Sequence, residues 1–151
     1  MKKQQKGFSL IELLIVVAII LIIAAIAIPN LLRSKMAANE ASAVGSLRTI
    51  NTASVAYSTT YGQYPTNLVN LETNGAVSST AADLIDTVLG SGSKSGYKFT
   101  FTVGGSNASY TIQATPITQG VTGQRGFFTD QSGVIRADTS GTATSASTPI
   151  S

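Results

Sequence analysis

An unbroken apolar run near the amino terminus constrains this chain more than any other feature. Between Leu13 and Leu32 there is no charged residue, and Asn30 is the one strongly polar residue. A helix of about 20 residues is about 30 Å long, which matches the hydrocarbon core of a bilayer. The rest of the chain is too small to cover a helix that is apolar on every side. The run therefore predicts a membrane-spanning helix rather than the buried helix of a soluble domain.

A single carboxylate, Glu12, stands at the front edge of this run. A charged side chain in lipid is costly, so such a residue is first interpreted as functional, with a partner to be identified. In the alternative interpretation Glu12 lies at the level of the headgroups and stabilises the start of the helix through the macrodipole.

The residues around Glu12 resemble the processing site of a type IV prepilin. Lysines occupy positions 2, 3 and 6, then come Gly7 and Phe8-Ser9-Leu10-Ile11, and Glu12 opens the apolar span. The resemblance is specific from residue 6 to residue 30 and extends to the rest of the chain only as general architecture. It implies that a membrane peptidase cuts after Gly7 and then methylates the new N-terminal amine of Phe8.

The same resemblance implies an assembly role for Glu12, which pairs with the amine of Phe8 on a neighbouring subunit. Both charges are unfavourable alone in lipid, and an ion pair offsets part of each desolvation cost. Pro29 predicts a kink, because it removes one helical hydrogen bond and clashes with the carbonyl of Ala25. The family commonly has a glycine seven residues before this proline, where the chain has Leu21. This departure leaves the extent of helix melting in a filament open.

An ordinary secretory signal is the alternative for this segment. Ala25-Ile26-Ala27 fits a small-x-small cleavage site, which would place the mature N-terminus at Ile28. However, the apolar run exceeds the usual signal core of about 7–15 residues. A signal peptide also gains nothing from Glu12, and the helical pattern continues beyond the supposed cut. These features favour the prepilin interpretation.

Charge and composition exclude several function classes. The chain has 10 basic and 7 acidic residues, a formal charge of +3, and three of the basic residues are the lysines before Gly7. Without them the side-chain charges balance, so the basic pI does not indicate nucleic-acid binding. The lysines instead favour a cytoplasmic N-terminus, against a weaker opposing signal from Arg33 and Lys35. With no cysteine and no histidine, the chain lacks thiolate and imidazole metal ligands and histidine-based catalysis.

Catalytic and metal-binding patterns are equally weak. The paired carboxylates are Asp83 with Asp86 and Asp130 with Asp138. The stretch 130–133 lacks the later bidentate glutamate of a calcium loop, so a turn aspartate is the better interpretation. We therefore expect no catalytic residue, no metal and no cofactor, and an assembly protein rather than an enzyme.

After Leu32 the helical pattern becomes amphipathic and continues to Tyr61. One stripe collects residues spaced by three and four, and the opposite side is polar. The stripe comprises Ala43, Leu47, Ile50, Ser54, Tyr57 and Tyr61, and the polar side Asn39, Arg48, Asn51 and Thr59. Gly62 and Pro65 mark the end of the helix. Asn74-Gly75 predicts a turn, and residues 80–89 predict a short helix capped by Thr80.

The periodicity then changes from helical to two. Residues 97–103 and 110–115 alternate around a turn at 104–107, and 126–129 with 134–136 form a second hairpin. The chain thus divides into a leader at 1–7, a transmembrane and assembly helix at 8–32, a globular head at 33–137 that includes the second half of the helix, and a flexible tail, or a weakly held terminal loop, at 138–151.

These patterns predict an α+β, pilin-like fold in which a long N-terminal helix packs against an antiparallel sheet of about four strands. The resemblance implies a structural subunit of a type IV pilus-like filament for adhesion or motility. It implies as partners further copies of the chain, a prepilin peptidase and methyltransferase, the inner membrane and the pilus assembly machinery. The subunit would lie in the bacterial inner membrane with a periplasmic head and then in an extracellular pilus. A pseudopilin of type II secretion, or a minor pilin, remains the alternative.

Overall fold

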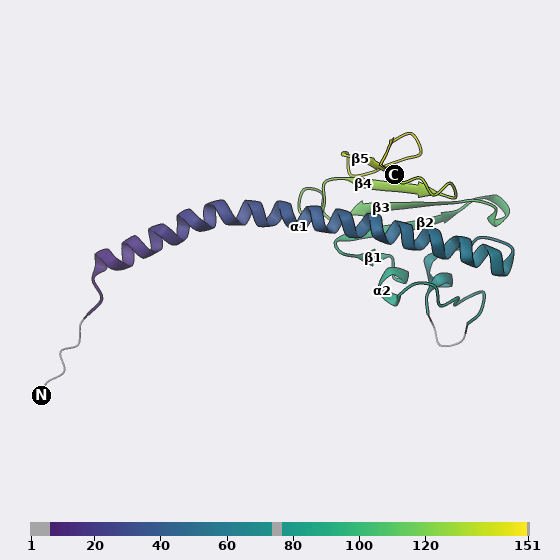
Figure 1. The fold of residues 1–151 in the computed structure, drawn as a ribbon, viewed down its shortest axis with the longest axis horizontal. Helices are drawn as coiled ribbons and strands as arrows, with labels where there is room; N and C mark the ends of the chain where they lie inside the picture. Colours follow the sequence, from purple (N-terminus) through teal and green to yellow (C-terminus); the bar gives the residue numbers. More distant parts are fainter. Residues whose placement is uncertain (1–6, 74–76, 151) are drawn as a thin grey trace, which may run out of the picture. The chain divides into compact units, whose positions relative to one another are not determined.

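The computed structural model describes residues 7–73 and 77–150 (Figure 1). These residues form two compact units, which divide between Ser34 and Lys35. Helix α1, Leu10–Tyr61, contributes its first part to one unit and its second part to the other. Residues 1–6 of the expected leader and the turn expected at Asn74-Gly75 lie outside the described residues. Each unit is described by itself below.

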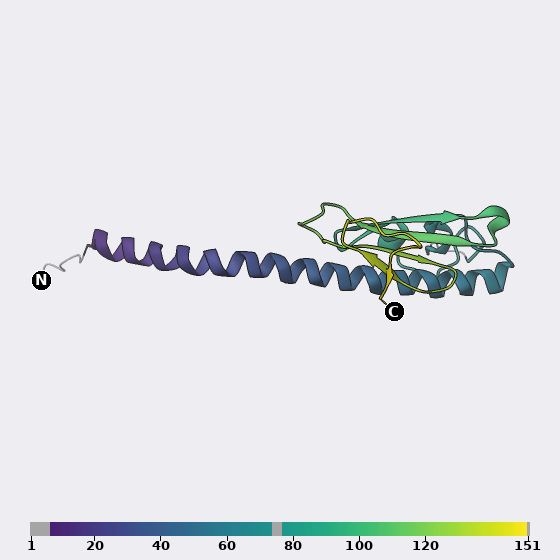
Figure 2. The same cartoon turned by 90° about the horizontal axis from the view of Figure 1, so that it is seen from above.

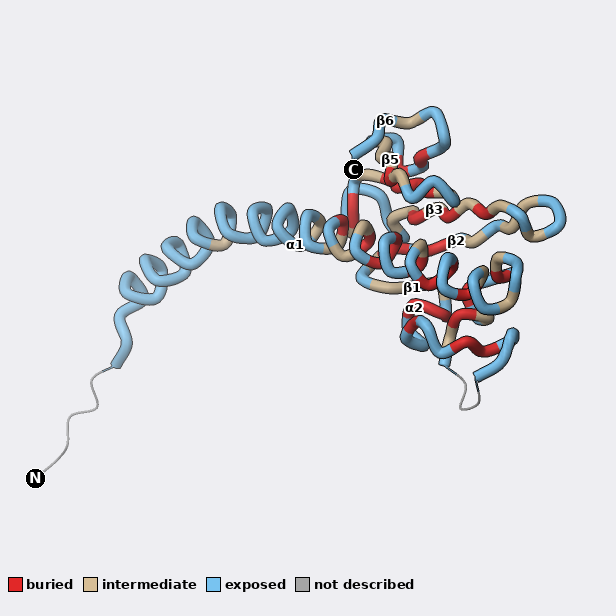
Figure 3. Tube along the Cα trace, turned by 45° about the vertical axis from the view of Figure 1, so that its right-hand side comes forward, coloured by how far each residue is buried: buried red, intermediate tan, exposed pale blue. Residues whose placement is uncertain are grey.

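The first unit consists of the apolar part of α1. Its large apolar side chains are exposed, including Leu14, Ile20 and Ile26 at 61%, 57% and 65% (Figure 3). By length and composition this helix could cross a membrane, and none of its most apolar window is buried within the chain. The helix continues through Pro29 without interruption. The kink expected at this proline stays a prediction.

In the second unit α1 buries the predicted stripe. Leu47 and Ile50 are fully buried, and Tyr57 is 4% exposed. The helix ends at Tyr61, and Gly62 follows with a φ of +75°. Its N–H donates to the carbonyl of Ser58 at 2.9 Å, so Gly62 supplies the left-handed conformation that ends the helix.

The segment between helix and sheet differs from the prediction. It contains the 3-10 helix η1, Leu68–Leu71, and the short helix α2, Thr87–Gly90. The helix predicted over residues 80–89 is wrong for its first part, where Asp83 has a φ of +54°. The N–H of Ile85 donates instead to the carbonyl of Leu71 at 3.0 Å. Pairing with η1 therefore satisfies this backbone and buries Ile85, which local propensity alone could not indicate.

Six strands form one antiparallel sheet in sequence order. They are β1 Ser93–Lys94, β2 Tyr97–Val103, β3 Tyr110–Pro116, β4 Gly126–Asp130, β5 Arg136–Asp138 and β6 Thr148–Pro149. The turn between β2 and β3 contains the 3-10 helix η2, Gly105–Asn107. The expected strands 97–103, 110–115 and 126–129 are confirmed, and the fourth lies two residues later than expected. The two further strands are two-residue edge strands, too short to show periodicity.

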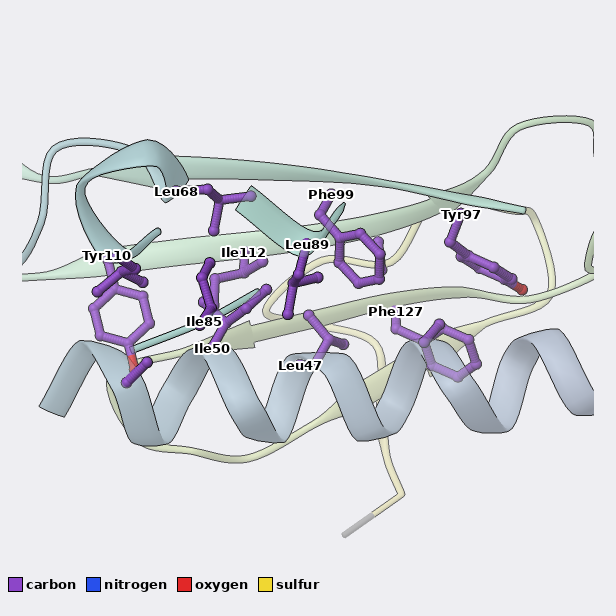
Figure 4. Close-up of a cluster of buried hydrophobic side chains, with 14 of the residues drawn as sticks. Leu47, Ile50, Leu68, Ile85, Leu89, Tyr97, Phe99, Tyr110, Ile112 and Phe127 are labelled. Atoms are coloured by element: carbon purple, nitrogen blue, oxygen red, sulfur yellow. The ribbon is translucent and has the colours of Figure 1, made fainter. Parts of the chain in front are cut away.

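Within the second unit the sheet lies on one side of α1 as a separate layer (Figure 2). Inward residues of three strands, Tyr97, Phe99, Tyr110, Ile112 and Phe127, meet Leu47 and Ile50 of the helix (Figure 4). Each of these side chains is at most 4% exposed. The predicted α+β fold, with its helix packed on an antiparallel sheet, is confirmed.

The last residues also carry regular structure. Strand β6 pairs with β5, and Ala143 is 1% exposed. The side-chain amide of Gln113 donates to the carbonyl of Ala143 at 3.2 Å, and Arg136 donates to the carbonyl of Ser147 at 3.1 Å. Residues 139–150 thus form a loop attached to the sheet rather than the free tail expected from their polar, aperiodic composition.

Candidate functional site

The predicted processing junction lies just before α1. Gly7 and Phe8 precede the first helical residue, Leu10, and Phe8 is 82% exposed. Among the described residues, a Cβ placed on Gly7 would meet no atom within 4 Å. Packing within the described chain therefore gives no reason for a glycine at this position.

Ser9 and Glu12 cap the start of α1. The backbone N–H of Ser9 donates to Oε2 of Glu12 at 3.0 Å, and the N–H of Ile11 donates to Oγ of Ser9 at 3.3 Å. These two contacts satisfy N–H groups that a helix start otherwise leaves unpaired. Glu12 was expected at the helix start and Ser9 was not, although the S-x-x-E spacing of these two residues is a known signal for a capped helix.

One oxygen of Glu12 is engaged in this cap. No described residue donates to the other, Oε1, and the side chain lies on the exposed start of the helix. The carboxylate can therefore hold the helix start and accept a second donor from outside the described chain. Among the described residues no hydrogen bond joins Phe8 to Glu12, and the backbone donor to this carboxylate is the N–H of Ser9.

Around Pro29, polar side chains bond back to the helix. The side-chain amide of Asn30 donates to the carbonyl of Ile26 at 3.1 Å, and the hydroxyl of Ser34 donates to the carbonyl of Asn30 at 3.0 Å. These bonds satisfy the side-chain donors of Asn30 and Ser34, but neither reaches the carbonyl of Ala25, which loses its helical donor at Pro29. Asn30 is thus accommodated in an otherwise apolar segment.

A second polar centre, which the sequence did not reveal, joins α1 to the loop before β4. Oε1 of Glu40 accepts from the backbone N–H of Gln124 at 2.9 Å and from that of Arg125 at 3.0 Å. Oε2 of Glu40 accepts from Nε of Arg125 at 2.8 Å. The Tyr97 hydroxyl donates to the carbonyl of Arg125 at 2.7 Å, so a buried carboxylate and a buried tyrosine fix the same residue.

The environment of Glu40 lowers the pKa of its carboxyl. Burial by itself would raise this pKa, but the N–H groups of Arg125 and Gln124 and the Arg125 guanidinium outweigh burial. The nearby Tyr97 responds in the opposite direction, since burial and the charge of Glu40 raise the pKa of its hydroxyl. Glu40 is therefore an ionised structural anchor.

Two residues expected on the polar side of the helix turn out to be half-buried. The amide of Asn39 donates to the carbonyl of Thr122 at 2.7 Å. The amide of Asn51 donates to Thr129 at 2.9 Å, and Asn51 accepts from the Tyr110 hydroxyl at 3.1 Å. Asn39 and Asn51 lie at the borders of the stripe, where the sheet and its loops reach the helix.

Asp130 and Asp86, one from each carboxylate pair noted in the sequence, make ordinary surface contacts. Oδ1 of Asp130 accepts from the N–H of Ser132 at 2.9 Å, as in an Asx turn. Asp86 pairs with Lys94 at 3.3 Å on the surface. Over residues 7–73 and 77–150, no group of three or more histidine, cysteine, aspartate or glutamate side chains could hold a metal ion.

Comparison with known proteins adds the family context. Residues 2–28 match the model of the prokaryotic N-terminal methylation motif. The chain is 60% identical over 38 residues to the type IV wide pilus major component PilA4 of Thermus thermophilus. This match covers 25% of the chain and 29% of that protein. It is 32% identical over 71 residues to the type II secretion system core protein G of Aeromonas hydrophila. This second match covers 47% of the chain and 50% of that protein.

The chain spans half the length, or less, of these two curated relatives. The motif includes Gly7, Phe8 and Glu12, which are the residues that the sequence singled out. These matches show that residues 2–28 carry the prokaryotic N-terminal methylation motif and that parts of the chain are similar to a type IV pilin and to a type II secretion core protein, as its resemblance to a prepilin indicated.

Proposed function

We propose that the chain is a structural subunit of a type IV pilus-like helical filament that supports attachment or motility, and not an enzyme. The observation that carries this proposal is the exposed apolar part of α1, none of whose most apolar window is buried, in a chain that also has a folded head. So large an apolar surface is unfavourable in water and has to be buried against lipid or protein. Lipid buries this surface before assembly, and the helices of neighbouring subunits bury it afterwards. A head-to-tail contact that does not close then produces a fibre.

Processing is the first step of this proposal. Residues 1–7 act as a leader, the peptidase cuts after Gly7, and Phe8 becomes the methylated N-terminus. Two observations support it: the match to the methylation motif, and the open space around Gly7, which leaves no role for a glycine in local packing. The requirement for glycine then belongs to the peptidase.

Pairing between subunits is the second step. The carboxylate of Glu12 accepts from the N-terminal amine of Phe8 on a neighbouring subunit. Support comes from Oε1 of Glu12, to which no described residue donates while Oε2 caps the helix. In an apolar layer an unpaired amine and an unpaired carboxylate are both unfavourable, so the pair favours the assembled state.

The remaining assignments follow from these two steps. Residues 8–32 serve as the anchor and filament core, residues 33–137 as the head, and residues 138–151 as its C-terminal segment. The subunit waits in the inner membrane with a cytoplasmic N-terminus and a periplasmic head, and the assembly machinery then moves it into an extracellular pilus. Pro29 introduces a kink into this helix.

A pseudopilin of type II secretion is the second candidate, because the match to core protein G extends over 71 residues and half of that protein. Deletion of the gene in its host distinguishes the two. A pilus subunit predicts loss of surface filaments with normal protein secretion, and a pseudopilin predicts the reverse.

Substitution of Glu12 tests the pairing proposal. Glu12→Leu should insert into the membrane normally, since removal of a charge makes insertion easier, but it should give few filaments because the neighbouring amine has no partner. Glu12→Gln keeps an oxygen for the Ser9 N–H and loses the charge, so it should be intermediate at best. Filaments are counted by electron microscopy beside membrane-fraction blots, with Ile15→Leu as the apolar control.

Wild-type filament numbers for Glu12→Leu would overturn the pairing. Wild-type numbers for Glu12→Gln alone would mean that the helix cap, rather than the charge, is what assembly requires.

A further inference from the structure

One side of β2 is covered by a neighbouring strand only at its start. β1 pairs with Tyr97 and Lys98, and the N–H of Phe99 donates to the carbonyl of Gly92 at 2.8 Å. Gly92 has a φ of +78°, and the chain before it belongs to α2 instead of following the strand. The rest of β2 therefore forms an open edge of the sheet beside β1 and α2 (Figure 1).

Alternation along β2 shows which backbone groups point to this open side. In an antiparallel strand the N–H and C=O of one residue face the same neighbour, and those of the next residue face the other neighbour. Phe99 bonds on the side of β1, whereas Gly104 donates to the carbonyl of Ser109 across the hairpin at 2.8 Å. The backbone groups of Phe101 and Val103 therefore point away from β3, and no hydrogen bond joins them to another described residue.

A groove of about 340 Å³ runs beside this edge, between β2 and the segments η1 and α2. Its lining includes Val69, which is 55% exposed, the half-buried Phe101 and the exposed Lys98. No carboxylate among the described residues forms an ion pair with Lys98. The groove thus combines unpaired backbone donors and acceptors with an apolar side chain and a positive charge.

The opposite edge of the sheet, β6, is protected against strand addition. The N–H of Ile150 donates to the carbonyl of Ile135 at 2.8 Å, so Pro149 is the residue of β6 whose backbone faces outward. Proline has no N–H and is a common protection of edge strands. The open part of β2, residues 99–103, contains no proline and no charged residue, so this edge is a template for another strand.

We propose that the open edge of β2 binds an extended segment of another polypeptide, which adds to the sheet as a further antiparallel strand. The N–H and C=O groups of Phe101 and Val103 bond its backbone. The side chain opposite Phe101 faces Val69 and is therefore apolar. A glutamate opposite Thr100 lies diagonal to Lys98, within reach of its ammonium group. The partner is thus an extended segment with alternating apolar residues and an acidic end.

The shape of the groove favours such a segment over a second copy of the chain. In a second copy the edge of β2 is bordered by its own η1 and α2, and these segments obstruct the pairing of two such edges. The β6 edge of a second copy cannot supply the missing donor either, because its outward residue is Pro149. An extended segment of a partner protein has neither restriction.

The test uses the full-length, isotope-labelled chain in detergent micelles, with amide hydrogen exchange and peptide binding followed by NMR. The probe is the acetylated and amidated peptide Thr-Val-Thr-Val-Glu, which places its second valine opposite Phe101 and its glutamate opposite Thr100. One control peptide has lysine in place of the glutamate, and another has proline in place of the second valine. Without peptide, the N–H groups of Phe101 and Val103 should exchange much faster than those of Thr100 and Thr102, which face β3.

We expect the glutamate peptide to slow exchange at Phe101 and Val103 and the proline peptide to leave it unchanged, because proline offers no N–H to the carbonyl of Phe101. Lys98→Glu should weaken binding of the glutamate peptide and strengthen binding of the lysine peptide, each by about two- to fivefold in Kd. Val103→Pro removes one donor from the edge and should weaken binding, whereas Val103→Ala keeps that N–H and should not.

Four results would overturn the proposal. Equal binding of the proline peptide would show that recognition is not strand addition. Exchange at Phe101 and Val103 that is as slow as at Thr100 at every protein concentration would show that the edge is closed. Slow exchange that is lost on dilution would identify a second copy as the occupant. Fast exchange that the glutamate peptide does not change would show that an open edge does not take up an acidic extended segment.

Discussion

At the scale of single residues, the two carboxylates of α1 show what a sequence can reveal. Glu12 was identifiable because it stands alone beside an apolar run. Glu40 lies on an amphipathic helix, where a glutamate is ordinary, and its partner Arg125 is 85 residues away. No local pattern connects these two residues, so the anchor they form emerges only when the chain folds.

The pH dependence of head stability should report on Glu40. Its folded-state pKa lies below the ordinary value of 4.5, so its contribution is complete above that value and is lost as the pH falls through the lowered pKa. At neutral pH, Glu40→Gln in a fragment beginning at Lys35 should cost about 1–3 kcal/mol of unfolding free energy, because hydrogen bonds to a charged group are lost. Urea unfolding at several pH values measures both effects.

The difference between wild type and Glu40→Gln should shrink as the pH falls below 4. Glu72→Gln, which removes a charge elsewhere on the head, serves as the control. A difference in unfolding free energy between wild type and Glu40→Gln that stays constant from pH 7 to pH 3 would show that the carboxylate does not anchor the loop in its ionised form.

At the scale of elements, the sequence predicted the helix and the strands that have a periodic hydrophobic pattern and missed the elements that have none. The helical stripe and strands β2, β3 and β4 were predictable because alternation and three–four spacing report directly on burial. The two-residue strands β1 and β6 show no period. Residues 80–86 look helical, but their backbone pairs with η1 instead, because a long-range contact overrides a local preference.

Substitutions in the helix–sheet interface should destabilise the head. Phe99 is 4% exposed and Leu47 is fully buried, so Phe99→Ala should cost about 3–5 kcal/mol and Leu47→Asp should prevent folding of the same fragment. Thr100→Ala, at an exposed position of the same strand, should change little. Thermal melting by circular dichroism measures all three, and melting unmoved by the first two changes would refute the interface.

Removal of residues 139–151 tests whether the C-terminal loop is part of the head. This loop supplies β6 and the buried Ala143, and it holds the side chains of Gln113 and Arg136. Truncation after Asp138 should therefore cost about 1–3 kcal/mol, as expected for the loss of buried contacts and hydrogen bonds. Removal of Ser151 alone is the control. A truncated fragment as stable as the untruncated one would support the flexible tail that the composition predicts.

At the scale of the whole molecule, the lysines that make the pI basic lie inside the N-terminal methylation motif. Three of the ten basic residues precede Gly7, and the methylation motif covers residues 2–28. The candidate site was thus predictable almost entirely from the first fifth of the sequence. The head was predictable only as a fold, because its polar contacts join residues that are distant in the chain.

Substitution of Gly7 tests how this first segment governs the fate of the whole subunit. In Gly7→Val, the branched side chain fits the described structure, where a Cβ meets nothing within 4 Å, so the head should fold and the helix should insert as before. The peptidase, however, needs a bare backbone at the cut, so unprocessed precursor should accumulate in the membrane and filaments should be absent. Gly45→Ala, at another glycine with open space around it, should be processed normally.

Intact mass and N-terminal sequencing measure the outcome. A wild-type N-terminus at Phe8 in Gly7→Val would show that cleavage does not need the glycine, and an N-terminus at Ile28 in the wild type would mean that an ordinary secretory signal, rather than a prepilin leader, begins this chain.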